Sequence, residues 1–178
     1  TLGNEKHINA RFYLDPNSIS IPGSDAVTVF LGTGEANGPV FRLRLGKNGA
    51  YYILIPSVYV DDGSATDGKP VYISDSWNAI EIEWQSASLG ANNGYLKLWV
   101  NNTLVDTLAN IDNDAHGLSA TSIGFEPSLP LSGGGGGVYS LVPFRKADNQ
   151  SAGKLDSNNG ALYFDAFEVR QDSFIGLP

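Results

Sequence analysis

Two glutamates provide the clearest arrangement of catalytic groups in this sequence. Glu81 and Glu83 are two positions apart in a segment that alternates apolar and polar residues, so both carboxylates share one face of a strand. Glycosidases use two carboxylates, roughly 5 to 10 Å apart, as acid and base or as acid and nucleophile. Gln85 follows where a further acid would help, and we interpret the pair as a solvated outward face that Arg42 and Arg44 could neutralise.

The histidines do not extend this pair into a catalytic set. His7 lies near the start of the chain and His116 lies in a polar segment, and the sequence has 2 histidines in all. A serine nucleophile of the hydrolase type would need a Gly-x-Ser-x-Gly turn, which the sequence lacks. We therefore interpret both histidines as surface residues, name no catalytic residue and predict that the chain is not an enzyme.

Aspartates gather in two polar segments that could bind calcium. Asp61, Asp62 and Asp67 belong to the first segment, and Asp112 and Asp114 belong to the second. Ca²⁺ takes about six to eight oxygen ligands, which carboxylates and turn carbonyls can supply. Neither segment has the spacing of an EF-hand loop, and Asp is also a common turn residue. A calcium site and ordinary turns both stay open.

Several aromatic residues could form a sugar-binding surface. Tyr95 and Trp99 share one face of an alternating segment, and Tyr59 and Tyr72 belong to two other strand-like segments. Sugar rings stack on exposed aromatic faces while neighbouring polar groups bind the hydroxyls. For Trp99, burial in the core is the alternative. We name these four residues as candidate ligand-binding residues.

Length and charge restrict the class of protein. The chain has 178 residues, enough for one domain with a full core, and no cysteine for a disulfide, a thiolate nucleophile or a zinc site. Its net charge of −8 disfavours nucleic acids and anionic membranes as partners. No apolar run is long enough for a membrane helix. The polar composition favours an extracellular or cell-surface protein, and because the chain begins with Thr1 we expect any targeting signal to lie outside it.

The dominant periodicity is alternation, which predicts a series of short strands and no long helix. The predicted strands are 8–14, 26–31, 40–45, 51–60, 71–73, 77–84, 95–100, 103–108, 120–125 and 162–169. Pro56 inside one of them predicts an edge strand or a break. Phe164 and Phe167 would lie on opposite faces of the last strand, which predicts a bulge between them. Region 127–159, with Gly133–Gly137, interrupts the pattern as a long insertion whose role stays open.

The most specific stretch of the sequence begins at Trp77. An alternating Ile-Glu-Ile-Glu-Trp run at 80–84 is followed by Leu-Trp-Val-Asn-Asn at 98–102, Ile-Gly at 123–124 and Tyr-Phe-Asp-Ala-Phe at 163–167. These motifs resemble the concanavalin A-like lectin/glucanase superfamily, and within it the laminin-G-like domains of bacterial surface and secreted proteins. The resemblance implies one all-β domain over 1–178, a two-sheet antiparallel jelly-roll sandwich whose first and last strands are adjacent.

The resemblance also directs the functional prediction. The chain lacks the Glu-x-Asp-x-x-Glu strand of glucanases in this superfamily and the Gln-x-His strand of alginate-lyase-type jelly rolls. Laminin-G-like modules often carry calcium, which implies Ca²⁺ at the aspartate segments. We predict a non-catalytic extracellular module that binds glycan or a neighbouring surface protein in adhesion. The alternatives are a structural spacer or self-assembling filament subunit, and a polysaccharide hydrolase or lyase.

Overall fold

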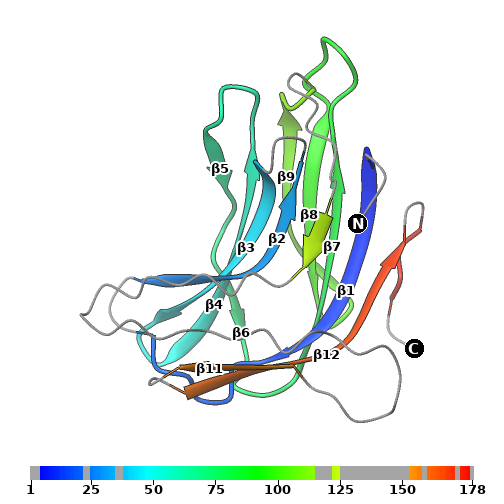
Figure 1. Cartoon of the computed structure of the whole chain (residues 1–178). Helices are drawn as coiled ribbons and strands as arrows, with labels where there is room; N and C mark the ends of the chain where they lie inside the picture. Colours follow the sequence, from blue (N-terminus) through cyan, green and yellow to red (C-terminus); the bar gives the residue numbers. More distant parts are fainter. Residues whose placement is uncertain are drawn as a thin grey trace.

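The chain folds into two antiparallel β-sheets packed face to face (Figure 1). The computed structural model describes residues 5–21, 25–34, 38–114, 122–124, 153–157, 160–170 and 173–176. In this part of the chain, sheet 1 has the strand order β11-β12-β1-β7-β8-β9. Sheet 2 has the order β10-β2-β3-β4-β5, and β6 also pairs with β4. None of the described residues form a helix that could span a membrane.

Ten of the strands correspond to the predicted segments, and β5 and β11 were not predicted. Sheet 1 contains β1 (His7–Asp15), β7 (Asn78–Gln85), β8 (Gly94–Val100), β9 (Thr103–Ile111), β11 (Gly153–Ser157) and β12 (Gly160–Arg170). Sheet 2 contains β2 (Ala26–Thr33), β3 (Pro39–Asn48), β4 (Tyr51–Tyr59), β5 (Ala65–Asp67), β6 (Val71–Ile73) and β10 (Ser122–Gly124). The predicted insertion 127–159, including Gly133–Gly137, lies outside the described residues except for β11 at 153–157.

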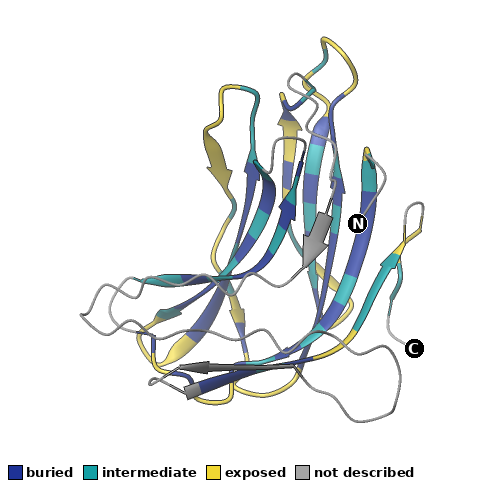
Figure 2. Ribbon diagram, viewed as in Figure 1, coloured by how far each residue is buried: buried dark blue, intermediate teal, exposed yellow. Residues whose placement is uncertain are grey.

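Side-chain alternation places the core between the sheets. Across sheet 1, Phe12 of β1 is opposite Ile80 of β7, which is opposite Val100 of β8, and all three are buried. From sheet 2, Phe30 and Phe41 meet them, with the Phe12 and Phe30 ring centroids 4.9 Å apart. Figure 2 shows buried positions along the strands of both sheets. Every second residue therefore points away from the core, onto one of two outer faces.

The predicted jelly-roll arrangement of the chain ends is confirmed. β1 pairs with β12 in antiparallel register, with Leu14 opposite Phe164. The predicted bulge is present, because the register shifts within β12 and Ala166 adopts a positive φ of 48°. The bulge lets Phe164 and Phe167 both reach the core, with ring centroids 6.2 Å from Phe12 and 5.8 Å from Phe30 respectively.

The prediction about Pro56 holds in part, and β2 departs from strict alternation. Pro56 does not break β4, because β4 pairs with β3 along its length, but it does lie at a locally open edge. On its other side β4 pairs first with β6, through 52–54, and then with β5, through 57–59. Pro56 lies where the neighbour changes, so its missing N–H removes no ladder bond. In β2, Val29 and Phe30 both face the core because the register shifts between Thr28 and Phe30.

Candidate functional site

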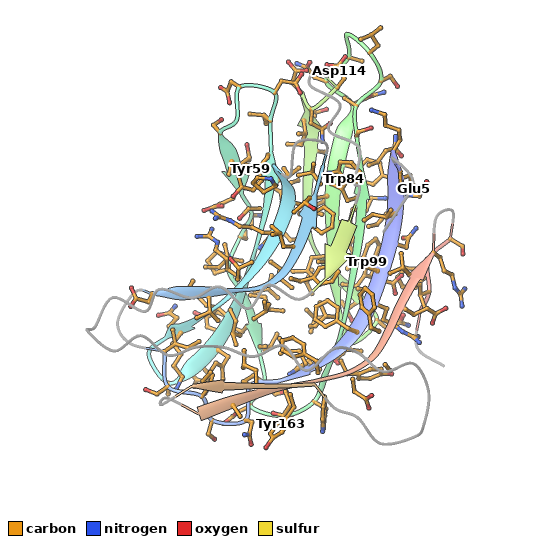
Figure 3. The ribbon with its side chains drawn as sticks, in the orientation of Figure 1. Glu5, Tyr59, Trp84, Trp99, Asp114 and Tyr163 are labelled. Atoms are coloured by element: carbon orange, nitrogen blue, oxygen red, sulfur yellow. The ribbon has the colours of Figure 1, made fainter. Side chains whose placement is uncertain are left out.

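The four predicted ligand-binding aromatics lie on two different surfaces, the outer faces of the two sheets. Tyr95 and Trp99 belong to β8 and lie on the outer face of sheet 1. Tyr59 and Tyr72 belong to β4 and β6 and lie on the outer face of sheet 2. Figure 3 shows Tyr59 and the core residue Trp84 on opposite sides of sheet 2. The four residues therefore cannot act in one site.

On sheet 1, Glu83 is the centre of a hydrogen-bonded group that also contains His7, Tyr95 and Lys97, here called the Glu83 network. The Tyr95 hydroxyl donates to Glu83 Oε1 at 2.5 Å, and Lys97 Nζ donates to Oε2 at 3.1 Å. His7 Nε2 lies 3.1 Å from Oε1. The groups come from adjacent strands, β1, β7 and β8, so the network ties three strands together.

The network favours the ionised form of Glu83 and the neutral form of Tyr95. Burial alone would raise the pKa of Glu83, but hydrogen bonds from Tyr95, Lys97 and His7 outweigh burial and hold it below its ordinary value. Burial, followed by the adjacent Glu83 carboxylate, raises the pKa of Tyr95. Tyr95 is therefore a committed donor, and Glu83 is an ionised acceptor whose oxygens are already occupied.

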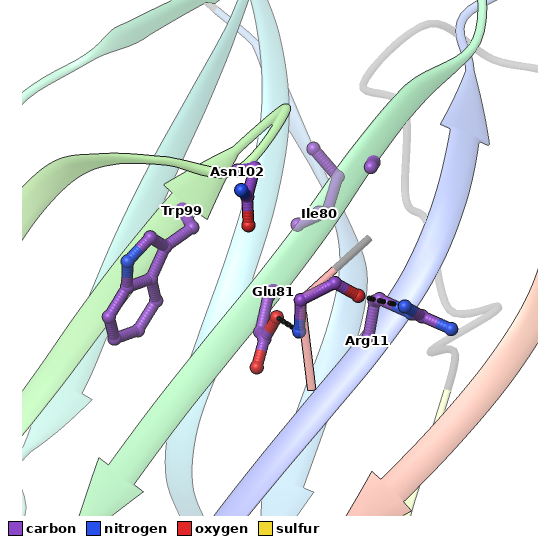
Figure 4. A pocket seen from close by; sticks show the side chains of 7 residues that line it. Arg11, Ile80, Glu81, Trp99 and Asn102 are labelled. Atoms are coloured by element: carbon purple, nitrogen blue, oxygen red, sulfur yellow. Dashed lines mark hydrogen bonds between the residues drawn. The ribbon is translucent and has the colours of Figure 1, made fainter. Parts of the chain in front are cut away.

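Glu81, on the same face, is covered by the end of the described chain. Its Oε1 accepts from the Ile175 backbone N–H at 2.6 Å and its Oε2 from the Gly176 N–H at 2.9 Å. Arg11 donates to the Gly176 carbonyl, as Figure 4 shows. The Phe174 ring packs on Trp99 with a centroid distance of 5.1 Å. We call residues 173–176 the strap.

These contacts overturn the interpretation of Glu81 and Glu83 as a solvated face paired with arginines. Glu81 is only 4% exposed, and the side chain of Glu83 is 15% exposed. Arg42 and Arg44 belong to β3 in sheet 2, on the other side of the core. The outward alternation was correct, but the strap and the network cover both carboxylates. His7 is likewise part-buried in the network, while His116 lies outside the described residues.

The outer face of sheet 2 carries a different set of groups, Arg42, Arg44, Ser57, Tyr59 and Asp67, here called the arginine face. Arg44 Nη2 donates to Asp67 Oδ2 at 2.6 Å and to Ser57 Oγ at 3.3 Å. The Ser57 hydroxyl donates to Asp67 Oδ1 at 2.6 Å. The Arg42 guanidinium lies over the Tyr59 ring, 5.5 Å from its centroid. Two cations thus face one carboxylate.

The arginine face has hydrogen-bonding capacity that the described residues leave unused. No described residue accepts a hydrogen bond from Arg42, and Nε of both arginines is buried without a partner there. Burial would raise the pKa of Asp67, but hydrogen bonds from Ser57 and Arg44 lower it, so the carboxylate stays ionised and serves Arg44. Among the described residues, the contact printed for the Arg42 guanidinium is the one with the Tyr59 ring, and a guanidinium has five donors and no acceptor.

Sequence reasoning missed the contact between Arg42 and Tyr59. The signal was the Asn48-Gly49 turn, where Gly49 has φ of 62°. That hairpin pairs β3 with β4 in continuous register and puts Arg42 opposite Ser57, two residues from Tyr59. A register counted outward from the turn would have brought these side chains to one face.

The two predicted aspartate segments meet in part. Carboxylate oxygens of Asp61, Asp112 and Asp114 lie within 4.8 Å of one another, and we call these three residues the aspartate cluster. The other two predicted ligands are elsewhere, since Asp62 accepts from the Ser64 backbone N–H at 2.7 Å and Asp67 belongs to the arginine face. Three carboxylates suit a hard cation such as Ca²⁺, and calcium binding there stays a prediction.

Comparison with known proteins places the chain by its fold. No protein-family profile matches the sequence, and no curated protein matches it. The structure is similar to an alginate lyase bound to an alginate tetrasaccharide, with 14% identity, a TM-score of 0.57, and coverage of 94% of this chain and 70% of that one. It is also similar to the endo-β-1,4-glucuronan lyase of Trichoderma reesei, with 10% identity, a TM-score of 0.58, and coverage of 92% and 68%.

A third similar structure is an alginate lyase of Pseudomonas aeruginosa, with 12% identity, a TM-score of 0.52, and coverage of 95% of this chain and 66% of that one. These similarities agree with the predicted concanavalin A-like sandwich fold. They also correct the functional prediction: these three structures are polysaccharide lyases, which contradicts the expectation of a non-catalytic module that is not an enzyme. At this level of identity, what the chain shares with these lyases is the jelly-roll sandwich.

Proposed function

We propose that this protein is a polysaccharide lyase that binds and cleaves an acidic glycan on the arginine face. The observation that carries the proposal is the pairing of Arg42, which has no acceptor among the described residues, with the Tyr59 ring 5.5 Å away. Arginine binds carboxylates in a planar, two-pronged geometry. A glycan built from uronic acids carries a carboxylate on each sugar, which Arg42 would bind.

The two residues suit the chemistry of a lyase. β-Elimination removes the proton from C5 of a uronate, breaks the C4–O4 bond and returns a proton to O4. Arg42, bound to the C6 carboxylate, stabilises the negative charge that develops there as the C5 proton leaves. The ionised oxygen of Tyr59 takes the C5 proton, and the phenol formed in this way donates that proton to O4. One oxygen performs both transfers when H5 and O4 lie on the same side of the sugar.

The outer face of sheet 1 is less suited to catalysis. The Glu83 carboxylate already accepts from Tyr95 and Lys97, and the Glu81 carboxylate accepts from two backbone N–H groups of the strap. A glycosidase needs one carboxyl group that is free to protonate the leaving oxygen and another that is free to attack or activate water. The hydrolase alternative therefore has no available acid pair on this face.

An acidic chain can bind an acidic substrate if the charge near the binding site is positive. The net charge is −8, yet the arginine face sets two guanidinium groups against the single carboxylate of Asp67. Attraction to a polyanion is local, because charges beyond about 10 Å are screened at 0.1 M salt. Substrate binding should weaken as salt rises. A polymeric substrate also favours the predicted extracellular location, since a long polysaccharide does not cross a membrane.

The test is the ultraviolet absorbance of the new C4=C5 double bond during incubation with alginate, glucuronan and a neutral glucan. Absorbance should rise with an acidic polymer and stay flat with the neutral one. Arg42→Ala and Tyr59→Phe should each lower the rate by about a hundredfold or more. Arg170→Ala is the matched control, because Arg170 is an exposed arginine on sheet 1. Lack of cleavage of both acidic polymers, or full activity in Arg42→Ala and Tyr59→Phe, would refute the proposal.

A further inference from the structure

Two exposed tyrosines stand at the other end of β4 from Tyr59, and we call them the tyrosine platform. Tyr51 is 67% exposed and Tyr72 is 58% exposed. Their ring centroids are 5.8 Å apart with an interplanar angle of 85°. Asn48 Nδ2 donates to the Tyr72 hydroxyl at 2.8 Å, which fixes that ring. A pair of large aromatic rings held in place in solvent indicates a surface that meets a ligand.

The platform shares its face with the arginines. In β4, Tyr52, Leu54 and Val58 belong to the core, so the alternate residues from Tyr51 to Tyr59 point outward. The second platform ring comes from β6, and its neighbours on either side in that strand pack toward the core. Both rings therefore lie on the outer side of sheet 2.

An apolar floor joins the platform to the arginine face. Ile53 is buried yet is not part of the core cluster, and Ile55 follows it on the same side, opposite Arg44 of β3. Tyr51 and Tyr59 are eight residues apart, which corresponds to about 26 Å along an extended strand. This distance covers several sugar units, with aromatic rings at both ends and cations between them.

We propose that the tyrosine platform is a distal subsite that stacks a sugar ring of the same acidic polysaccharide, several units from the bond that is cleaved. This inference rests on the proposed function, which supplies the arginine face as the other anchor. A long uronate polymer would span both anchors, whereas a trisaccharide held at Arg42 would not reach the platform. Because the second contact is then intramolecular, the polymer gains affinity that the short sugar lacks.

The experiment measures binding of alginate polymer and of a uronate trisaccharide to the full chain, in a Tyr59→Phe background so that cleavage does not interfere. The double variant Tyr51→Ala/Tyr72→Ala should bind polymer about tenfold more weakly and trisaccharide unchanged. Tyr51→Phe/Tyr72→Phe keeps both rings and should retain most of the polymer affinity. Trp77→Ala, which removes an exposed aromatic of 46% exposure elsewhere, is the control for lost surface area.

The outcomes separate this inference from the proposed function. Equal polymer affinity in the double alanine variant and its parent overturns the platform, even if the wild-type protein cleaves alginate. Equal losses for polymer and trisaccharide overturn it too, since the effect then does not depend on length. Selective loss for polymer supports the platform even if wild-type protein never forms the double bond, a result that would refute lyase activity alone.

Discussion

Replacement of Glu81 by Gln should release the strap from sheet 1 and destabilise the domain. The carboxylate is 4% exposed and accepts backbone hydrogen bonds at 2.6 Å and 2.9 Å, one on each oxygen. Gln has nearly the same shape but one acceptor oxygen, so one backbone N–H faces an NH₂ donor. Loss of one charge-assisted hydrogen bond and its burial cost is about 3 kcal/mol.

That free energy can be measured directly. For a urea m-value of roughly 2 to 3 kcal/mol/M, the unfolding midpoint should fall by about 1 M. Hydrogen exchange should also accelerate at the Ile175 and Gly176 amides, because these are the donors. If only the strap detaches, amide exchange still accelerates. The unfolding midpoint then falls by less than about 1 M, because the domain loses only the free energy that holds the strap.

The matched control is Glu168→Gln. The Glu168 side chain is 35% exposed and pairs with Arg11 and Arg170, so its replacement should cost under about 1 kcal/mol. An unchanged midpoint together with unchanged exchange in Glu81→Gln would refute the reasoning that this carboxylate holds the strap. A loss of similar size in both variants would show that the burial of Glu81 confers no special role.

Three further predictions concern stability. The pKa of Glu83 is lowered in the folded state, so its contribution to the free energy of unfolding is complete above its ordinary pKa of 4.5 and is lost as pH falls through the lower folded value. Glu83→Gln should therefore lose less stability than wild type below about pH 4, measured by unfolding at a series of acidic pH values. A Cβ at Gly32 would lie 2.3 Å from the Phe41 ring, whereas one at Gly38 would meet nothing within 4 Å. Gly32→Ala should therefore cost about 1 to 3 kcal/mol in urea unfolding and Gly38→Ala much less, and similar midpoints would contradict this packing. If the aspartate cluster binds Ca²⁺, millimolar calcium should raise Tm in wild type and not in Asp112→Asn, and an unchanged Tm in wild type would count against calcium there.

Local sequence patterns predicted most of the strands and their facing. Alternation identified which residues of β1, β7 and β8 enter the core, because a strand turns successive side chains to opposite sides whatever it pairs with. The two phenylalanines of β12 predicted its bulge for the same reason, since strict alternation could not bury both. Turn residues such as Asn101 and Asn102, both with positive φ, marked the hairpin between β8 and β9.

The functional residues depended on contacts that no local pattern contains. Glu81 and Glu83 were correctly placed on an outward face, but a segment more than 90 residues away covers the first, and groups from two other strands occupy the second. Asp61 and Asp112 come from segments far apart in the chain, and only the fold brings their carboxylates together. Arg42 and Glu81 have opposite charge and both lie in segments that alternate apolar and charged residues, so the sequence allowed them to pair. The fold places them in different sheets.

The sequence by itself determined the β-class, the alternation of inner and outer residues and the main turns, whereas the pairing of the first and last strands was implied by the family resemblance. The tertiary structure alone decided on which outer face each polar residue lies and which carboxylates are covered. It also decided that the Arg42 guanidinium lies over the Tyr59 ring. The physical reason is that side-chain direction follows from backbone geometry within a strand, whereas partnership between outward groups depends on sheet assignment and register. Those are settled by burial of the whole core, a property that is summed over residues distant in the chain.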